Sequence, residues 1–563
     1  MNYNLLAREE VGRLVEAAAV KAAADGALPA AENIAYIVEI PRETAHGDWS
    51  TNYALAAAKP MRMSPRKIAD ALTARIDLTD TYFASVEVAG AGFLNFRLGP
   101  KWFASVPKTI LTEGAEFAKS KAAHPEKIMV EFVSANPTGP MHMGNARGGV
   151  LGDCLSEILT YTGHDVWREF LVNDAGNQVA LLGISLDARY QQSFPETADF
   201  PFPDDGYHGE DVKEIAAGFK AEFGDMRTMP EDERREKLAQ YALKHNIANM
   251  RRDLERYGIT YDRWFHETEL HNAGFVEDTV KLLTEKGLTY EKDDALWFRT
   301  TAFDSKTLAI RKDDVLRKSN GFYSYFAVDI AYHRDKFLVR GFDRVINLWG
   351  ADHHGQIARL KAGMQAIGVD PDRLEIVLFQ FVNLMQNGEI VRMSKRTGRA
   401  VSLSDLLDDI SVDAARFFFN SRPTDTRLDF DLDLAVRSDS ENPVYYVQYA
   451  HARICSLLDN LSKNGVPVDP NADLSCLSSP EETALIRALA AFPDELLTAA
   501  EMREPSRVNR YLISVAADFH RFYNAHRILG TDEAPARAVL AAAVRDVLRT
   551  GLGIIRVSAP THM

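Results

Sequence analysis

A chain of 563 residues, with 46% hydrophobic and 26% charged residues, has the composition of an ordinary water-soluble protein with several domains. Its three cysteines are too few and too widely spaced for a disulfide framework or a zinc site, and its net charge of −15 argues against wholesale nucleic-acid binding without excluding a local basic face. No run of eighteen apolar residues and no secretory signal pattern is present, so we expect a cytoplasmic protein with no membrane span.

Residues 1–110 have the pattern of a small α+β unit. Apolar side chains at Leu5, Val11 and Leu14 recur at helical spacing. The elements that follow are predicted in this order: a strand over 34–40, a loop over 46–52, a helix around Lys59, and strands near 86–88 and 93–98. This order favours a helix-on-sheet accessory domain over a second active site.

The stretch 127–153 is predicted to form the centre of a nucleotide site. Residues 128–133 are apolar and β-branched, as in a buried parallel strand, and Asn136 to Pro140 end the strand. A helix opens near His142 and Gly144. Since the end of a parallel strand here delivers a loop to a helix N-terminus, whose free N–H groups attract phosphate, the segment indicates nucleotide binding. It is neither a GxGxxG fingerprint nor a P-loop.

His142 and Gly144 each suit a part of that chemistry. His142 can donate a hydrogen bond to an α-phosphate as charge builds on it, and Gly144 lets the nucleotide approach the backbone closely. By itself the HxG triplet is common, and a histidine near a helix start is more often a polar cap.

The chain from 166 to 320 continues this unit and then departs from it. A second strand, 166–172, gives βαβ spacing and therefore two parallel strands in one sheet. Residues 194–207 are rich in Pro, Asp and aromatic residues, which suits a loop or lid, and 231–258 is a long charged helix. Because strand and helix alternate again afterwards, we expect an internal insertion over about 185–320.

The strand 345–349 is followed by polar residues suited to a ligand. Gly350, Asp352 and His353 come at its end, where ligands sit in open α/β sheets. The pair His353 and His354 could suggest a metal, but adjacent side chains point apart and no partner is spaced for zinc. We therefore favour contact with the nucleotide.

Lys395 provides a second candidate contact with the nucleotide. It lies in a Ser-, Thr- and Gly-containing loop, where a mobile ammonium can reach β- and γ-phosphates and stabilise pyrophosphate as it leaves. Alone, Met-Ser-Lys is more often a surface loop. It follows His142 by about 250 residues, after a resumed αβ pattern. The two motifs together indicate adenylate chemistry, in which a carboxylate attacks the α-phosphate of ATP and the acyl group then passes to a ribose hydroxyl.

From about 430 the sequence is helical and rich in Ala and Leu, with Pro and Gly between the runs, as in a helical bundle. The predicted helices are 445–461, 480–497, 506–528 and 535–552. Arg507, Arg510, Arg521 and Arg527 could form a basic face for RNA phosphates, although a solvated helix face is about as good an interpretation.

These motifs together resemble the arginyl-tRNA synthetases, a family of class I aminoacyl-tRNA synthetases. Pro-Met-His-Met-Gly-Asn is similar to the His-X-Gly-His signature, with Asn145 in place of the second histidine. Met-Ser-Lys-Arg is similar to the Lys-Met-Ser-Lys-Ser loop, with Arg392 and Arg396 as departures. The turn 172–176, the segment 350–356 and the run Tyr-Val-Gln-Tyr-Ala-His-Ala-Arg extend the similarity over nearly the whole chain.

The resemblance implies an α/β fold with a Rossmann-type parallel-sheet catalytic domain over 111–428. It also implies an N-terminal α+β domain over 1–110 that touches the tRNA elbow, and a C-terminal all-α anticodon-binding bundle over 429–563. The activity would be arginine–tRNA ligation by a monomer, with ATP and Mg²⁺ as the substrate complex, no zinc and no organic cofactor. The partners would be L-arginine and tRNA(Arg), and activation would need bound tRNA. Candidate contacts with tRNA are His46, Asn52, Arg507, Arg510, Arg521 and Arg527.

The same resemblance assigns candidate site residues. The catalytic residues would be His142, Asn145 and Lys395. Contacts with ATP would come from Gly139, His142, Gly144, Asn145, Gly350, Asp352, His353, Met393, Ser394 and Lys395. Contacts with arginine would come from Glu131, Ser134, Asn136, His142, Tyr325, Asp329 and Gln356.

The chemistry of arginine agrees with this assignment. A guanidinium offers five donors in a plane and keeps its charge, so its pocket needs a carboxylate and an aromatic wall, which Asp329 and Tyr325 could supply from one helical turn. By resemblance, Glu131 and Asn136 would hold the α-ammonium. Taken alone, Tyr325 would be a core residue and Asp329 a helix cap.

Three other functions are weighed against this one. A synthetase for a hydrophobic amino acid would leave Asp329 unpaired in a buried pocket, at an appreciable free-energy cost. A non-catalytic tRNA-binding paralogue would be expected to lack His142 or Lys395, and only Asn145 favours it. A free-standing nucleotidyltransferase would leave the helical bundle unexplained.

Overall fold

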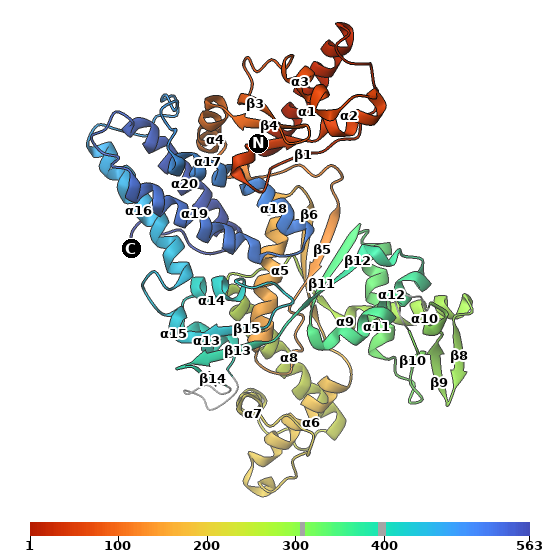
Figure 1. Ribbon diagram of the computed structural model, residues 1–563. Helices are drawn as coiled ribbons and strands as arrows, with labels where there is room; N and C mark the ends of the chain where they lie inside the picture. Colours follow the sequence, from red (N-terminus) through yellow and green to blue (C-terminus); the bar gives the residue numbers. More distant parts are fainter. Residues whose placement is uncertain (304–309, 392–400) are drawn as a thin grey trace.

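The computed structural model describes residues 1–303, 310–391 and 401–563, and its centre is a five-stranded parallel sheet (Figure 1). The strand order is β12–β11–β5–β6–β7. The strands are β5 (Lys127–Glu131), β6 (Asp165–Val172), β7 (Arg263–His266), β11 (Arg344–Gly350) and β12 (Leu374–Phe379). The predicted α/β class is therefore confirmed.

Alternation along β5 separates the two faces of the sheet. Ile128 and Val130 belong to the core that includes α5 (Met143–Tyr161), whereas Met129 belongs to the core formed with α11 (Tyr325–Arg334) and α12 (Ile357–Ile367). Because side chains alternate along a strand, Glu131 lies on the same side as Met129. The sheet thus presents a carboxylate toward α11.

Helix α5 packs very closely on the segment that follows β5. A Cβ placed on Gly152 would lie 2.2 Å from Cγ of Phe132, so only glycine fits. The same helix carries Asp153, whose carboxylate Oδ2 accepts from the buried Arg416 guanidinium at 2.5 Å. Arg416 also donates to the backbone oxygen of Ile555 near the C-terminus. Helix α5 therefore joins the sheet to the C-terminal bundle.

The N-terminal unit combines antiparallel strands with helices. The sheet order is β1–β2–β4–β3, with β1 (Val38–Glu39), β2 (Trp49–Thr51), β3 (Phe83–Ala89) and β4 (Phe93–Leu98). Its helices are α1 (Tyr3–Ala24), α2 (Tyr53–Met61) and α3 (Pro65–Thr73). Strand β2 lies inside the segment 46–52 predicted as a loop, because Trp49 to Thr51 are buried against β4. The predicted strand 34–40 is reduced to the two residues of β1.

The region predicted as one insertion, about 185–320, contains a strand of the central sheet, which corrects that expectation. A helical unit comes first, with α6 (Asn177–Gln192), α7 (Glu210–Phe223) and α8 (Glu231–Arg256), and β7 then pairs with β6. After it follow α9 (Glu267–Asn272), α10 (Phe275–Glu285) and the antiparallel strands β8 (Thr289–Lys292), β9 (Ala295–Phe298) and β10 (Asp314–Arg317). Only four residues of β7 pair with β6, and so short a strand shows no clear apolar pattern in the sequence.

The C-terminal part is a helical bundle, reached through α13 (Leu403–Asp409), α14 (Val412–Phe419) and α15 (Leu432–Ala435). Nearby, β14 (Glu389–Val391), β13 (Val382–Gln386) and β15 (Leu428–Asp431) form a small sheet. The bundle helices are α16 (Pro443–Lys463), α17 (Pro480–Ala490), α18 (Phe492–Glu501), α19 (Ser506–Ala525) and α20 (Ala534–Ile554). The predicted helix 480–497 is divided at Ala491, since Pro493 lies in the first turn of α18.

The N-terminal unit and the bundle are in direct contact, and they lie beside each other at the top of the view in Figure 1. Asn4 donates to Asp494 of α18 at 2.8 Å, and Arg487 of α17 pairs with Asp48 at 2.9 Å. Helix α4 (Pro100–Glu113) packs against α17 and α20. The first and the last domains of the chain are therefore in contact with each other.

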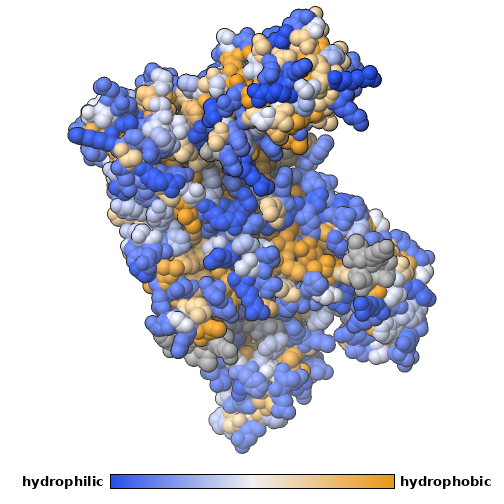
Figure 2. Space-filling view, viewed as in Figure 1, coloured by the Kyte–Doolittle hydropathy of each residue, from blue (hydrophilic) through white to orange (hydrophobic). Residues whose placement is uncertain are grey.

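The outer surface is largely polar. On the face shown in Figure 2, hydrophilic residues predominate and hydrophobic ones gather in patches near the middle of the molecule. None of the helices in the described ranges is long and apolar enough to cross a membrane.

Replacing Gly152 by alanine is expected to lower the free energy of unfolding by about 1–3 kcal/mol, the usual cost of overpacking, because the new methyl group would collide with Phe132. Gly553 in α20 is a matched control, since a Cβ there meets nothing within 4 Å. Its replacement by alanine should leave stability unchanged or raise it slightly. Thermal unfolding of both variants measures the difference, and equal destabilisation would contradict the packing.

Candidate functional site

A cavity of about 830 Å³ lies at the carboxyl ends of the parallel strands. Glu131 from β5, Leu171 from β6, Leu348 from β11 and Phe379 from β12 line it. Ligands bind at this edge in open α/β sheets. The cavity therefore occupies the position that the fold reserves for a ligand.

Most of the candidate residues for ATP and arginine meet in this cavity. Those that line it are Glu131, Ser134, Asn136, Gly139, His142, Gly144, Asn145, Asp329, Gly350, Asp352, His353 and Gln356. Tyr325 is not in the lining; it begins α11 and is 52% exposed. Met393, Ser394 and Lys395 lie outside the described residues.

His142 caps the helix that starts at the cavity. Its Nδ1 accepts a hydrogen bond from the Gly144 N–H at 3.1 Å, while the Asn145 side-chain oxygen accepts from the His142 N–H at 3.0 Å. The ring proton of a neutral imidazole must then lie on Nε2, which is left as a donor. Burial lowers the pKa of His142, and the Asp352 carboxylate partly offsets that effect. His142 is thus a neutral donor whose orientation Asn145 helps to fix.

The segment after Lys395 is held against the His142 loop. Ser402 forms an isolated antiparallel bridge with His142, and the Leu403 N–H donates to the Met141 carbonyl at 2.9 Å. Two stretches that lie far apart in the sequence therefore share one strand-like contact at the cavity.

The surroundings of Asp329 disfavour the ionised form of its carboxyl group. Burial raises its pKa to about 7, the neighbouring Glu131 charge adds to the rise, and Arg359 opposes it. A cation bound beside Asp329 would favour the ionised form. This side chain is therefore suited to a positively charged ligand.

Glu131 is already paired with a lysine that sequence reasoning missed. Lys336 lies in the π-helical turn η5 (Asp335–Val339), its side chain is 0% exposed, and its ammonium forms an ion pair with Glu131. The Ser134 hydroxyl donates to the other Glu131 oxygen at 3.0 Å. Nothing in the sequence around Lys336 marks it, because the contact depends on how α11 crosses the sheet.

The backbone after β5 is strained where it borders the cavity. Val133 and Ser134 have φ angles of 69° and 42°, a left-handed conformation that is rare for a β-branched residue such as valine. Such strain persists only where the surroundings enforce it, and it often accompanies functional sites. Here it turns the Ser134 hydroxyl toward Glu131 and lets it also accept from the Leu171 N–H at 3.1 Å.

Asn136 links two loops of the cavity. Its amide nitrogen donates to Gln178 at 2.7 Å, and its amide oxygen accepts from Asn173 at 2.8 Å. The predicted contact with the α-ammonium thus involves a residue that also joins the first loop to the turn after β6.

The helical unit contributes cavity residues that were not predicted as ligand contacts. Tyr207, His208 and Gly209 precede α7, and Met250 belongs to α8. Asn246 of α8 fixes this unit to the first loop by donating to the Pro137 carbonyl at 2.9 Å. The composition of 194–207 indicated a loop or lid, but no sequence signal placed individual side chains at the cavity.

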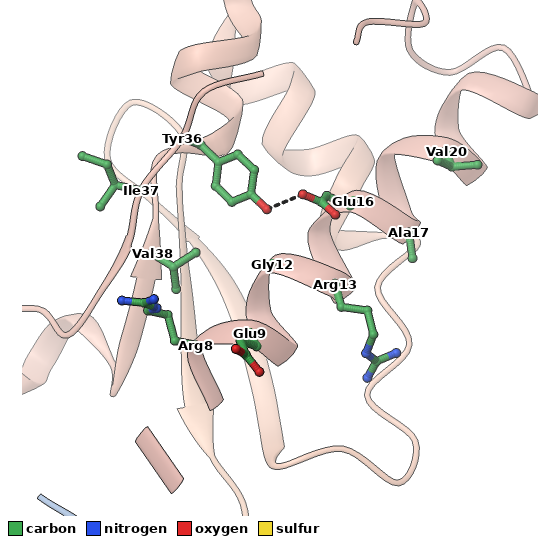
Figure 3. Close-up of a pocket in the computed structure, with 10 residues that line it drawn as sticks. All are labelled: Arg8, Glu9, Gly12, Arg13, Glu16, Ala17, Val20, Tyr36, Ile37 and Val38. Carbon is green, nitrogen blue, oxygen red and sulfur yellow. Dashed lines mark hydrogen bonds between the residues drawn. The ribbon is translucent and has the colours of Figure 1, made fainter. Parts of the chain in front are cut away.

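A second cavity, of about 790 Å³, lies in the N-terminal unit (Figure 3). Side chains of α1, among them Arg8, Arg13 and Glu16, form one wall, and residues 36–38 form the other. The Tyr36 hydroxyl donates to Glu16 at 2.7 Å across it. None of the candidate site residues lines this cavity, so it does not compete with the first.

The candidate tRNA contacts differ in their surroundings. His46 is exposed, whereas the Asn52 side chain accepts from the Ile37 N–H at 2.8 Å and so ties β1 to β2. In the bundle, Arg507 pairs with Glu495 at 2.9 Å, Arg510 with Glu504 at 2.8 Å, and Arg521 with Asp518. Arg527 is exposed and donates to the Leu529 carbonyl at 3.2 Å. Acidic neighbours therefore compensate most of this basic face.

Comparison with known protein families places the whole chain in one class. The family described as tRNA synthetases class I (R), catalytic domain, matches residues 106–431. The Arginyl tRNA synthetase N terminal domain matches 13–98, and the DALR anticodon binding domain matches 447–563. The fold and the cavity thus define a class I tRNA synthetase. The chain belongs to the arginyl-tRNA synthetase family.

Individual relatives are similar to this chain over nearly their full length. The chain is 48% identical over 561 residues to the arginine–tRNA ligase of Acetivibrio thermocellus, covering 99% of each chain. It is 48% identical over 562 residues to that of Caldanaerobacter subterraneus subsp. tengcongensis, again over 99% of each. Thermus thermophilus arginyl-tRNA synthetase has the same fold, with a TM-score of 0.71 at 22% identity, over 98% of this chain and 100% of that one. The predicted family is confirmed.

Replacing Asp329 by asparagine is expected to stabilise the ligand-free protein at alkaline pH. The folded pKa of about 7 lies above the ordinary 3.8, so the wild type loses stability as the pH rises from about 4 to 7. The loss is at most about 4 kcal/mol at about 1.4 kcal/mol per pKa unit. Thermal unfolding at pH 5 and pH 8 should show a larger gain for the variant at pH 8. Equal gains at both would contradict the raised pKa.

Proposed function

We propose that this protein joins arginine to tRNA. The arginine carboxylate attacks the α-phosphate of ATP, the bond to the bridging oxygen breaks, and pyrophosphate leaves. A ribose hydroxyl at the 3′ end of tRNA then attacks the carbonyl carbon and AMP leaves. The observation that carries this proposal is a single cavity that contains both the His142 loop and Asp329.

ATP would lie across the carboxyl ends of β5 and β11. His142 Nε2 would donate to the α-phosphate as negative charge builds there, and Gly139 and Gly144 would allow close approach of the backbone. Gly350, Asp352 and His353 would line the nucleoside side. Mg²⁺ would accompany ATP as part of the substrate, and the reaction requires no protein nucleophile.

Lys395 would neutralise the leaving pyrophosphate, with Met393 and Ser394 beside it. The support from the described residues is indirect: Ser402, seven positions further on, is bridged to His142. Seven residues of extended chain span at most about 25 Å, a length that permits the proposed contact.

Asp329 would pair with the substrate guanidinium, with Tyr325 and Gln356 as further contacts. Glu131 and Asn136 would receive the α-ammonium. An arginine cation is the ligand that best satisfies the Asp329 carboxyl, since a neutral side chain would leave the charge unpaired in the cavity wall. This argument favours arginine over a hydrophobic amino acid.

The remaining parts would serve the tRNA. Residues 1–110 would touch the elbow, the catalytic domain would span 111–428, and the bundle from 429 would read the anticodon. Arg507 and Arg510 of α19 are paired with acidic side chains, so RNA phosphates would have to displace those partners. By family resemblance the enzyme would work as a cytoplasmic monomer, without zinc, and would need tRNA for activation.

Exchange of labelled pyrophosphate into ATP tests the activity. We expect exchange with arginine alone among the amino acids, dependent on added tRNA. His142→Ala should lower the rate by about 10²–10³, the usual effect of removing one preorganised donor. His124→Ala is the matched control, because His124 is exposed before β5 and does not line the cavity. Exchange with a different amino acid, or with none, would sink the proposal.

Asp329→Asn tests the arginine contact. The KM for arginine should rise about 10- to 100-fold, the value of a charged hydrogen bond, while the KM for ATP stays within about twofold. In the wild type the arginine KM should also rise as the pH falls below 7, because Asp329 becomes protonated, and the variant should lack this dependence. Asp372→Asn, an exposed remote carboxyl, should change neither constant. An equal rise for both substrates would make Asp329 structural.

A further inference from the structure

Two carboxylates stand side by side on adjacent parallel strands, one at the end of β5 and the other inside β6. Glu131 of β5 is the register partner of Glu169 of β6, and on the other side of Glu131 the register partner is Asn347 of β11. All three are buried. Two like charges so placed cannot both stay ionised without cations, so the surroundings must supply them.

The π-helical turn η5 brings Lys336 to one of these carboxylates and places Arg340 next to the other. The Arg340 N–H donates to the Asp335 carbonyl at 2.9 Å, the five-residue step of a π turn. Lys336 pairs with Glu131, and Arg340 donates to Glu169 at 3.0 Å. Burial alone would raise the pKa of Glu169, yet the Arg340 hydrogen bonds and charge bring it below its ordinary value.

Lys336 has further contacts besides Glu131. Its Nζ lies 3.5 Å from the Asn347 side-chain oxygen and 4.0 Å from the centre of the Tyr332 ring. The Asn347 amide nitrogen lies 2.9 Å from His333 Nε2, and His333 Nδ1 lies 2.8 Å from the Asp329 carbonyl oxygen. One buried ammonium therefore connects Glu131 to the helical turn that carries Asp329.

We propose that Lys336 is a positioning residue of the amino-acid subsite: its ammonium holds the Glu131 carboxylate in one position at the cavity wall, where that carboxylate receives the substrate's α-ammonium. The proposal rests on the proposed function. A buried ion pair adds little stability over apolar residues of the same shape, so its place beside the cavity calls for another role. Lys336 and the Ser134 hydroxyl bind different oxygens of Glu131, so the two contacts together fix the orientation of the carboxylate.

Each end of the substrate then has its own carboxylate. Asp329 serves the guanidinium, and Glu131, held by Lys336 and Ser134, serves the α-ammonium. The two groups come from α11 and β5, and Lys336, seven residues after Asp329, locks the two elements together. The spacing between the two subsites is thus set by how α11 continues into the π turn.

Binding of two ligands to the full-length protein separates this role from a structural one. The ligands are L-arginine and 5-guanidinopentanoic acid, which is arginine without its α-amino group, and calorimetric titration gives both dissociation constants. Lys336→Met should weaken arginine binding by about 10- to 100-fold and change the binding of the deaminated acid by less than about twofold. Equal weakening of both ligands would overturn the proposal.

Two further variants guard against misfolding. The double variant Glu131→Gln with Lys336→Met removes both charges together and should show the same selective loss of arginine binding even if Lys336→Met alone does not fold. Arg537→Met breaks another buried pair, with Glu482 at 2.9 Å in the bundle, and should leave both ligands unaffected. If the wild-type protein fails to bind arginine, the proposed function itself is refuted. If the wild type binds arginine but Lys336→Met weakens the binding of both ligands equally, only the role of Lys336 is refuted.

Discussion

Neutralising two neighbouring carboxylates is the physical requirement on which the catalytic core depends. Glu131 and Glu169 lie in register on adjacent parallel strands, on the face that α11 covers. Each must find a cation or lose its charge, since burial removes the water that would otherwise stabilise it. The π turn that continues the covering helix carries Lys336, and Arg340 follows that turn, so these two contacts hold the helix over the sheet. Asp329 of the same helix lines the cavity.

Helix α5 joins the His142 loop to the rest of the protein. Its first residues hold His142 in one tautomer, its middle packs on Phe132 at a glycine, and its later turns bind the C-terminal part. There Asp153 pairs with Arg416, and Glu157 pairs with Arg556 just beyond α20. The His142 loop and the helical bundle are thus built on one element. The N-terminal unit contacts the same bundle.

Sequence reasoning succeeded where one element carried its own signal. The apolar runs near 128–133, 166–172 and 345–349 correspond to β5, β6 and β11, and the Ala- and Leu-rich runs correspond to the bundle. Sequence reasoning failed where a strand forms only because a neighbouring strand pairs with it. Strand β2 lies in a polar segment that pairs only because β4 is beside it, and β7 is too short to show a period. The break at Ala491 was missed because a proline in a first helical turn is compatible with a continuous apolar pattern.

The sequence by itself determined the class of protein, because phosphate chemistry requires particular residue types in short loops, and these survive as local patterns around His142 and Lys395. It also indicated Asp329, since a guanidinium calls for a carboxylate. Only the tertiary structure decided which charges face each other. Lys336 and Glu131 are 205 positions apart in the sequence, and they meet because α11 packs over β5. Ser402 and His142 are likewise far apart in the sequence and meet beside the cavity. Side chains brought together by packing share no sequence spacing, so no local pattern can reveal their contact.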